Sequence, residues 1–266
     1  LLLARGPGEK IQLQRAMPLY SAFGEGSRRL VVMDRFDGRV HWTRDALFNF
    51  RHNAIAVGAG KVFCLDRMTE ERLAHFRRRG TVPAAEFALH ALDIHTGEPV
   101  WQSTELAFGT WLAYSESTGL LLQAGSKNRD RATDEVGKGL AVFEGATGRL
   151  IWHLDEDYGG PPLLYPDKIV TQGTAYDLWT GAAIQRTHPL TGQPLRWGFS
   201  RNYGCNTAIG CLNLITFRSA AAGYFDLAND GGTGNWGGFR SGCTANLIVA
   251  DGLVNAPDYT RTCTCS

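Results

Sequence analysis

Short runs in which hydrophobic and polar residues alternate recur along the chain, and pairs of these runs flank a turn that contains glycine. Residues 30–33 and 39–42 surround the first such turn, and residues 88–92 and 99–101 surround the second. An alternation with a period of two gives an extended chain one apolar and one polar face, as in a half-buried strand. The pattern therefore predicts β-hairpins joined by tight turns.

These turns share a motif that consists of Asp, two residues, Thr or Asp, Gly, three residues and Trp. Residues 34–42 and 93–101 match it in full, and residues 144–152 carry Glu144 in place of the Asp. Residues 177–185 end on Gln185 in place of the Trp. Two weaker copies follow. In the first, Thr191 and Gly192 precede Trp197, and in the second, a turn at residues 226–231 lacks its Trp.

The chemistry of a hairpin explains each position of the motif. Glycine tolerates the positive φ of a tight turn, and a short acidic side chain can accept the N–H groups of that turn. A Trp at a fixed offset places a large ring with one N–H donor at the same point of every unit. We therefore predict structural roles for the turn glycines Gly38, Gly97, Gly148 and Gly181 and for the packing residues Trp42, Trp101 and Trp152.

The four turn glycines are separated by 59, 51 and 33 residues, a mean of about 48. A four-stranded blade of a β-propeller repeats every 40–50 residues or so. Further candidate strands lie where a blade requires them, at residues 54–57, 61–65, 111–114, 120–123, 162–165 and 168–171. We predict an all-β β-propeller of four-stranded antiparallel blades, about five to six in number, at residues 1–50, 51–106, 107–157, 158–200 and 201–266.

The repeated motif resembles that of the PQQ-like (quinoprotein dehydrogenase-like) β-propellers, a family that includes PQQ-dependent alcohol dehydrogenases and outer-membrane assembly lipoproteins. The resemblance covers roughly residues 20–200, and residues 203–206, 230–235 and 263–266 are similar to the last part of certain multi-domain bacterial propeller proteins. It implies that Trp42, Trp101 and Trp152 dock between neighbouring blades. It also implies a seven- or eight-bladed ring, so we expect an incomplete ring, the C-terminal part of a longer protein that carries the remaining blades.

Composition narrows the classes of function. The chain has 27 Lys and Arg against 26 Asp and Glu, 44% hydrophobic residues and 32 glycines among its 266 residues. A net charge of +1 argues against a dedicated nucleic-acid binder, and no apolar run approaches the roughly 18 residues of a membrane span. Two polar inserts interrupt the pattern: residues 67–80 predict a short helix with Thr69 as its N-cap, and residues 126–139 predict a loop.

Five of the six cysteines fall in a segment rich in Gly, Asn and Thr, which could build little apolar core and would gain from cross-links. They are Cys205, Cys211, Cys243, Cys263 and Cys265. We expect disulfides among them and hence a periplasmic or extracellular location in the cell envelope, although an odd number leaves at least one thiol free or paired elsewhere. A zinc site is less favoured because the spacing lacks Cys-x-x-Cys, and Cys64 reads as a small buried thiol.

The same segment offers candidate ligand-facing residues, namely Asn206, Arg218, Asn235, Trp236 and Arg240. Arginine could bind a carboxylate with two hydrogen bonds. The alternative is an irregular blade whose arginines bond backbone carbonyl groups.

Two functions compete. The first is a non-catalytic propeller that presents a binding face to a protein or small ligand, with no catalytic residue, no cofactor and no metal. The second, implied by the resemblance, is a PQQ-dependent dehydrogenase for alcohols or sugars, with the quinone and Ca²⁺ on the propeller axis. The adjacent cysteine pair typical of its alcohol-oxidising members is absent here. A hydrolase or lyase is a third and weaker alternative. We therefore expect a binding and scaffold module.

Overall fold

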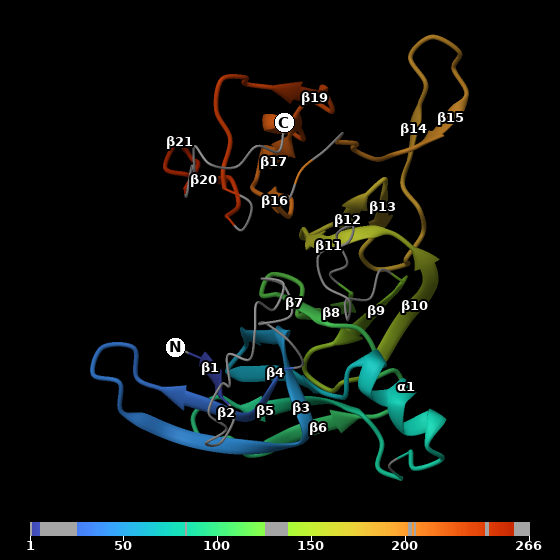
Figure 1. Cartoon of the computed structure of the whole chain (residues 1–266). Helices are drawn as coiled ribbons and strands as arrows, with labels where there is room; N and C mark the ends of the chain where they lie inside the picture. Colours follow the sequence, from blue (N-terminus) through green and yellow to red (C-terminus); the bar gives the residue numbers. More distant parts are fainter. Residues whose placement is uncertain are drawn as a thin grey trace. The chain divides into compact units, whose positions relative to one another are not determined.

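The computed structural model describes residues 2–5, 26–82, 84–125, 138–201, 204, 206–242 and 245–257. They form strands and one helix, which Figure 1 shows in chain order. Two compact units emerge, the first from residues 1–157 with 178–181 and the second from residues 158–177 with 182–266.

Unit 1 contains ten strands and the helix. The strands are β1 (Leu2–Arg5), β2 (Ser27–Met33), β3 (Val40–Gly58), β4 (Lys61–Asp66), β5 (Ala88–Asp93), β6 (Pro99–Ser103), β7 (Trp111–Ser115), β8 (Leu120–Ala124), β9 (Lys138–Glu144) and β10 (Leu150–Asp157). Strands β1 to β6 form one sheet in chain order, and β7 to β10 form a four-stranded sheet. Every pairing is antiparallel and joins strands that are neighbours in sequence. This meander is the construction of a propeller blade.

The six-stranded sheet is two blades that share the long strand β3. Residues 40–50 of β3 pair with β2, and residues 50–58 pair with β4 after a register shift between Phe50 and Ile55. A bulge of this kind bends a strand and lets its two halves serve different neighbours. The candidate strand at residues 54–57 is therefore the second half of β3 and not a separate strand.

The second half of β3 forms the middle blade of unit 1 together with β4, β5 and β6. The core of unit 1 lies on both faces of this blade. On β4, Val62 and Cys64 belong to a buried cluster that includes Leu30 of β2. The alternate residues Phe63 and Leu65 belong to a second cluster, with side chains from β7, β8 and β9. Because side chains of a strand point alternately to opposite faces, the middle blade is packed between its two neighbours, as blades of a propeller are.

Unit 2 contains the remaining strands. These are β11 (Gly159–Leu164), β12 (Lys168–Gln172), β13 (Thr174–Asp177), β14 (Gln185–Thr187), β15 (Pro194–Arg196), β16 (Ile209–Gly210), β17 (Leu214–Ser219), β18 (Ala221–Asp226), β19 (Gly232–Asn235), β20 (Ile248–Ala250) and β21 (Leu253–Asn255). Strands β16 to β19 form a second four-stranded antiparallel sheet, and β11 to β13 form a three-stranded one. Phe199, Phe217 and Phe225 are buried together in the core of unit 2. The predicted all-β class, built from antiparallel propeller blades, is confirmed.

The predicted helical insert is also confirmed. Helix α1 (Glu70–Arg78) has Thr69 as its N-cap, and the Thr69 side chain accepts a hydrogen bond from the backbone N–H of Arg72. Leu73 is its most buried apolar anchor, at 7% exposure. Within the described residues, no helix has both the length and the apolar character that a bilayer span requires. The predicted loop at residues 126–139 lies almost wholly outside the described residues.

Candidate functional site

The repeated indoles all point at the next copy of the turn. Nε1 of Trp42 donates to the carbonyl of Ile94 at 2.8 Å, and Nε1 of Trp101 donates to the carbonyl of Gly145 at 3.0 Å. Trp152 donates in the same way to the carbonyl of Leu178 at 2.9 Å. Each acceptor lies just before the glycine of the following motif, so each indole joins one hairpin to the next within unit 1.

The turn glycines explain how the rings approach so closely. A Cβ built on Gly97 would lie 2.7 Å from the ring of Trp42, and one on Gly148 would lie 2.6 Å from the ring of Trp101. Gly181 stands in the same relation to Trp152, at 2.9 Å. Gly38 has the same positive φ, but nothing lies within 4 Å of a Cβ there. In three of the four turns glycine therefore provides both the turn conformation and the space for an indole.

In the two full copies of the motif, the acidic residue accepts hydrogen bonds from the backbone of its own turn. Oδ1 of Asp93 accepts the N–H groups of His95 and Thr96 at 2.9 and 2.8 Å, and Asp34 accepts those of Phe36 and Asp37. These hydrogen bonds favour the charged carboxylate, so they lower the pKa of both Asp93 and Asp34. The carboxylates of the motif thus stabilise hairpins.

Unit 2 contains a related contact that departs from the motif. Nε1 of Trp197 donates to Oδ1 of Asp230 at 3.0 Å, and its ring meets Phe225 edge-on at 5.3 Å. The weak fifth copy therefore places its indole on the weak sixth turn, with a carboxylate as the acceptor in place of a backbone carbonyl.

Two of the predicted ligand-facing residues lie together in the interior of unit 2. Asn206 is 3% exposed and Arg218 is fully buried. Asn206 accepts from Nη1 of Arg201 at its carbonyl (2.7 Å) and from the backbone N–H of Arg218 at Oδ1 (3.0 Å), and its Nδ2 donates to Ser241 at 3.0 Å. Arg201 thus bonds a backbone carbonyl, as the alternative interpretation of an irregular blade expects of its arginines. For Asn206 and Arg218 a ligand-binding role stays a prediction.

The other three candidates lie nearer the surface. Asn235 is exposed, and it donates to the carbonyl of Ser219 at 3.1 Å. Trp236 is 38% exposed, and its ring centroid lies 4.6 Å from that of Tyr224. Arg240 is half-buried. For these residues a ligand-binding role stays a prediction.

The predicted disulfides are not supported at Cys211. Its thiol is free and donates to the carbonyl of Leu214 at 3.1 Å. This hydrogen bond lies within the short turn between β16 and β17. Cys205, Cys243, Cys263 and Cys265 lie outside the described residues. Cys64 is buried and free as predicted, and burial raises the pKa of its thiol.

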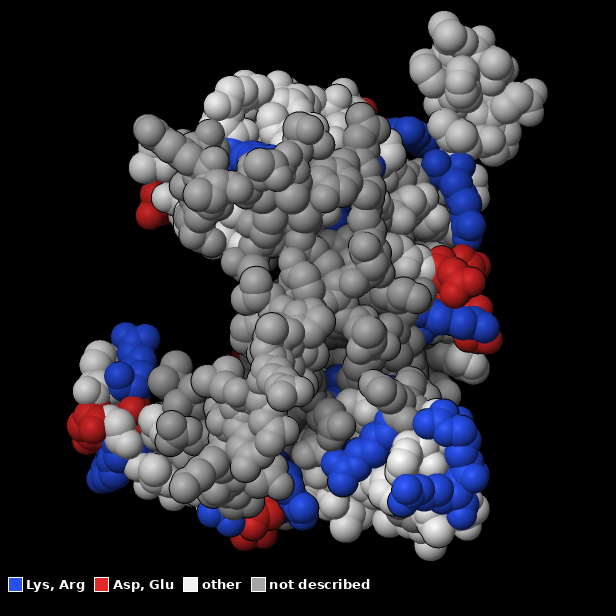
Figure 2. Space-filling model, viewed as in Figure 1, with Lys and Arg blue, Asp and Glu red and all other residues white. Residues whose placement is uncertain are grey.

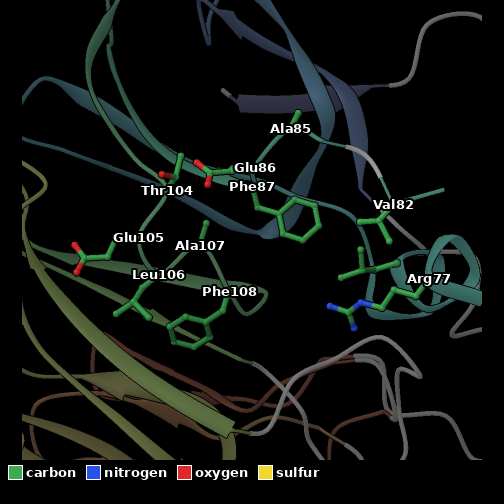
Figure 3. Close-up of a pocket in the computed structure, with 11 residues that line it drawn as sticks. Arg77, Val82, Ala85, Glu86, Phe87, Thr104, Glu105, Leu106, Ala107 and Phe108 are labelled. Atoms are coloured by element: carbon green, nitrogen blue, oxygen red, sulfur yellow. The ribbon is translucent and has the colours of Figure 1, made fainter. Parts of the chain in front are cut away.

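A pocket of about 430 Å³ in unit 1 was missed by the sequence analysis (Figure 3). Helix α1 contributes Leu73 and Arg77, and Val82 and residues 85–87 and 104–108 contribute the rest. These segments are distant in sequence and share no motif, so only the fold brings them together. The volume lies within the range of roughly 300–1,000 Å³ that is usual for ligand pockets.

A smaller pocket of about 190 Å³ shares Glu86 with the first and is lined by Arg44, Asp66 and His90. Asp66 uses both carboxylate oxygens to accept the N–H groups of Leu47 and Phe48, at 2.6 and 2.9 Å. Burial lowers the pKa of His90. Among the described residues, no group of three or more His, Cys, Asp or Glu side chains could hold a metal ion.

The Asn206 side chain bonds protein atoms, and the carboxylates of Asp34, Asp93 and Asp66 accept backbone N–H groups. These four side chains are therefore engaged within the protein.

Comparison with known proteins gives one match by family and several by structure. The family described as outer membrane protein assembly factor BamB matches residues 17–157, more than half of the chain. No curated protein sequence matches the chain.

Among solved structures, BamB from Moraxella catarrhalis is 13% identical over 77% of this chain and 55% of its own, with a TM-score of 0.48. A europium-containing methanol dehydrogenase is 13% identical over 74% and 50%, with a TM-score of 0.42. The quinohemoprotein alcohol dehydrogenase ADHIIG from Pseudomonas putida HK5 is 16% identical over 75% and 42%, with a TM-score of 0.37. The chain spans about half the length of the first two. We draw no conclusion about activity from these likenesses.

Proposed function

Because this chain belongs to the PQQ-like repeat family described as outer membrane protein assembly factor BamB, we propose that it is a non-catalytic binding and scaffold module of the bacterial cell envelope. The name of that family describes a role in assembly, which requires contact with other proteins. By analogy, the partner of this chain is a protein.

One observation carries the proposal: the polar groups of the repeat are used inside the framework. The motif carboxylates hold their turns, the indole N–H groups hold the next turn, and Asn206 holds the backbone of unit 2. A framework built in this way is rigid and positions its surface loops. Binding residues commonly lie on loops that a rigid scaffold positions.

The first experiment separates binding from catalysis. The chain is incubated with PQQ and Ca²⁺, and reduction of an artificial electron-acceptor dye is followed with simple alcohols and aldose sugars. We expect the rate to equal that of a heat-denatured sample. Substrate-dependent dye reduction that requires PQQ would contradict the proposal and favour a quinone-dependent dehydrogenase.

The second experiment tests location. The epitope-tagged protein is expressed in its host, and the cells are separated into cytoplasmic, periplasmic and membrane fractions with a marker for each. We expect the protein with the periplasmic or membrane marker. Recovery with the cytoplasmic marker would contradict a location in the cell envelope. The dye assay would still decide between binding and catalysis.

A further inference from the structure

The walls of the 430 Å³ pocket are held in place by contacts behind them. The ring of Phe87 meets Phe48 edge-on at 5.1 Å, and the guanidinium of Arg67 lies 5.4 Å from the centre of the same ring. The carbonyl of Leu106 accepts a hydrogen bond from the buried Gln123. A pocket whose walls are already ordered loses little conformational entropy when a ligand enters, which favours affinity.

The ring of Phe108 is fixed in a similar way. A Cβ built on Gly139 would lie 2.9 Å from this ring, so the ring packs directly against the backbone of β9. Phe87, Leu106 and Phe108 are all half-buried, so each keeps part of its apolar surface open. Together they offer an apolar floor for one large side chain.

Charges divide the rim of the pocket into two ends. In Figure 3 the guanidinium of Arg77 lies on one side with Val82, and the carboxylates of Glu86 and Glu105 lie towards the other side. All three charged side chains belong to exposed residues. An acidic group is therefore attracted to the Arg77 end and repelled from the opposite end, which would give a bound chain one preferred direction.

The positive end of the pocket continues over helix α1. Arg78 and Arg79 follow Arg77 and are exposed, as is Arg72 one turn earlier. Figure 2 shows Lys and Arg side chains gathered on the part of the surface where Figure 1 places α1. Arg77 lines the pocket, and the other three arginines add positive charge to the surface around α1, which favours a ligand with several negative charges.

We propose that this pocket binds a peptide segment of a partner protein in which acidic residues adjoin one large apolar side chain. The apolar side chain enters between Phe87, Leu106 and Phe108, and the acidic residues lie over the arginines of α1. This inference rests on the proposed binding function and names its partner chemistry. A peptide is favoured over a small molecule because the positive surface extends from the pocket along the helix.

The test uses the full chain and fluorescein-labelled decapeptides, with binding measured by fluorescence anisotropy. One pair of peptides carries four acidic residues on either the N-terminal or the C-terminal side of a single Phe. Matched peptides replace the Phe by Ala or the acidic residues by Lys. We expect one acidic peptide to bind, with a loss of about tenfold or more when its anchoring Phe is removed. The lysine peptides should not bind.

Protein variants locate the binding. Val82→Trp fills the rim of the pocket from an exposed position, and Arg77→Glu reverses its positive end. Each variant should lower the affinity for the acidic peptide about tenfold or more. Two control variants, Leu190→Trp and Arg39→Glu, introduce the same new side chains at exposed positions that do not line the pocket. They should leave the affinity unchanged. Thermal melts confirm that each variant folds, and Ala107→Leu replaces Val82→Trp if that variant does not.

Three results would overturn this inference. The first is no binding of either acidic peptide at millimolar concentration. The second is equal binding of the peptide without Phe, which would indicate attraction by the arginines alone. The third is unchanged affinity in a folded variant with a filled pocket. None of these results bears on the dye assay or on the cell fractionation, so failure of this site remains distinguishable from failure of the proposed function.

Discussion

Replacement of Trp101 by alanine tests the indole contacts most informatively. The Trp101 ring packs against Gly148, lies 5.9 Å from the ring of Phe63 and donates to the carbonyl of Gly145. Truncation of a fully buried Trp costs about 3–5 kcal/mol. Because Trp101 is half-buried, we expect the free energy of unfolding to fall by about 2–4 kcal/mol.

Two further variants divide this loss into its parts. Trp101→Phe keeps much of the ring but removes the N–H donor, so it should cost about 1 kcal/mol, the usual net value of one hydrogen bond. Trp179→Ala truncates an indole that is 51% exposed and lies outside the docking positions. This control should lower the free energy of unfolding clearly less than Trp101→Ala does.

The assay is urea unfolding followed by far-ultraviolet circular dichroism, which reports both units of the chain. The midpoint and the slope are fitted for each variant, because a change in slope would indicate a change in cooperativity and not in stability alone. If Trp101→Ala lowers the free energy of unfolding no more than Trp179→Ala does, the indole does not join neighbouring hairpins and the reasoning is wrong.

Three other predictions follow from the same structure. Gly148→Ala should lower the melting temperature more than Gly60→Ala, because both glycines have positive φ but only at Gly148 would the Cβ meet an indole; equal shifts would contradict this reason. Asn206→Ala should lower the free energy of unfolding in urea by about 1–3 kcal/mol, since it leaves the buried N–H of Arg218 without its acceptor and removes the bond to Ser241, whereas the exposed Asn235→Ala should cost much less. The lowered pKa of Asp93 means that its charged form stabilises the folded chain above the unfolded-state pKa near 4, and that this contribution is lost as the pH falls through the folded-state pKa. The stability difference between the natural chain and Asp93→Asn, measured from pH 7 down to pH 2, should therefore shrink at the acidic end, and a constant difference would show that the carboxylate charge is not involved.

The sequence predicts the hairpins because their chemistry is local. The positive φ of Gly97, the hydrogen bonds of Asp93 and the short apolar runs of β4 and β5 all depend on residues within a few positions of one another. The predicted helix has the same basis, with Thr69 accepting an N–H group three residues on. Signals of this kind can be read without knowledge of the tertiary structure.

The features that were missed depend on contacts between distant segments. The fusion of two predicted strands into β3 follows from a bulge near Phe50, where the partner changes from β2 to β4. No residue type marks that exchange. The inward orientation of Asn206 and Arg218 is likewise set by packing, since the same residue types in an open loop would face a ligand. The pocket beside α1 has no sequence signal because three separate segments form it.

Hydrogen exchange of the indole N–H groups tests the central claim most directly. The chain is labelled with ¹⁵N-tryptophan, its indole signals are assigned by single substitutions, and exchange in D₂O is followed by NMR. We predict slow exchange for Trp42, Trp101 and Trp152, whose N–H groups are bonded to the next turn, and faster exchange for Trp236, which is 38% exposed. Exchange of the three bonded indoles at the rate of Trp236 would contradict the account of hairpins joined one to the next.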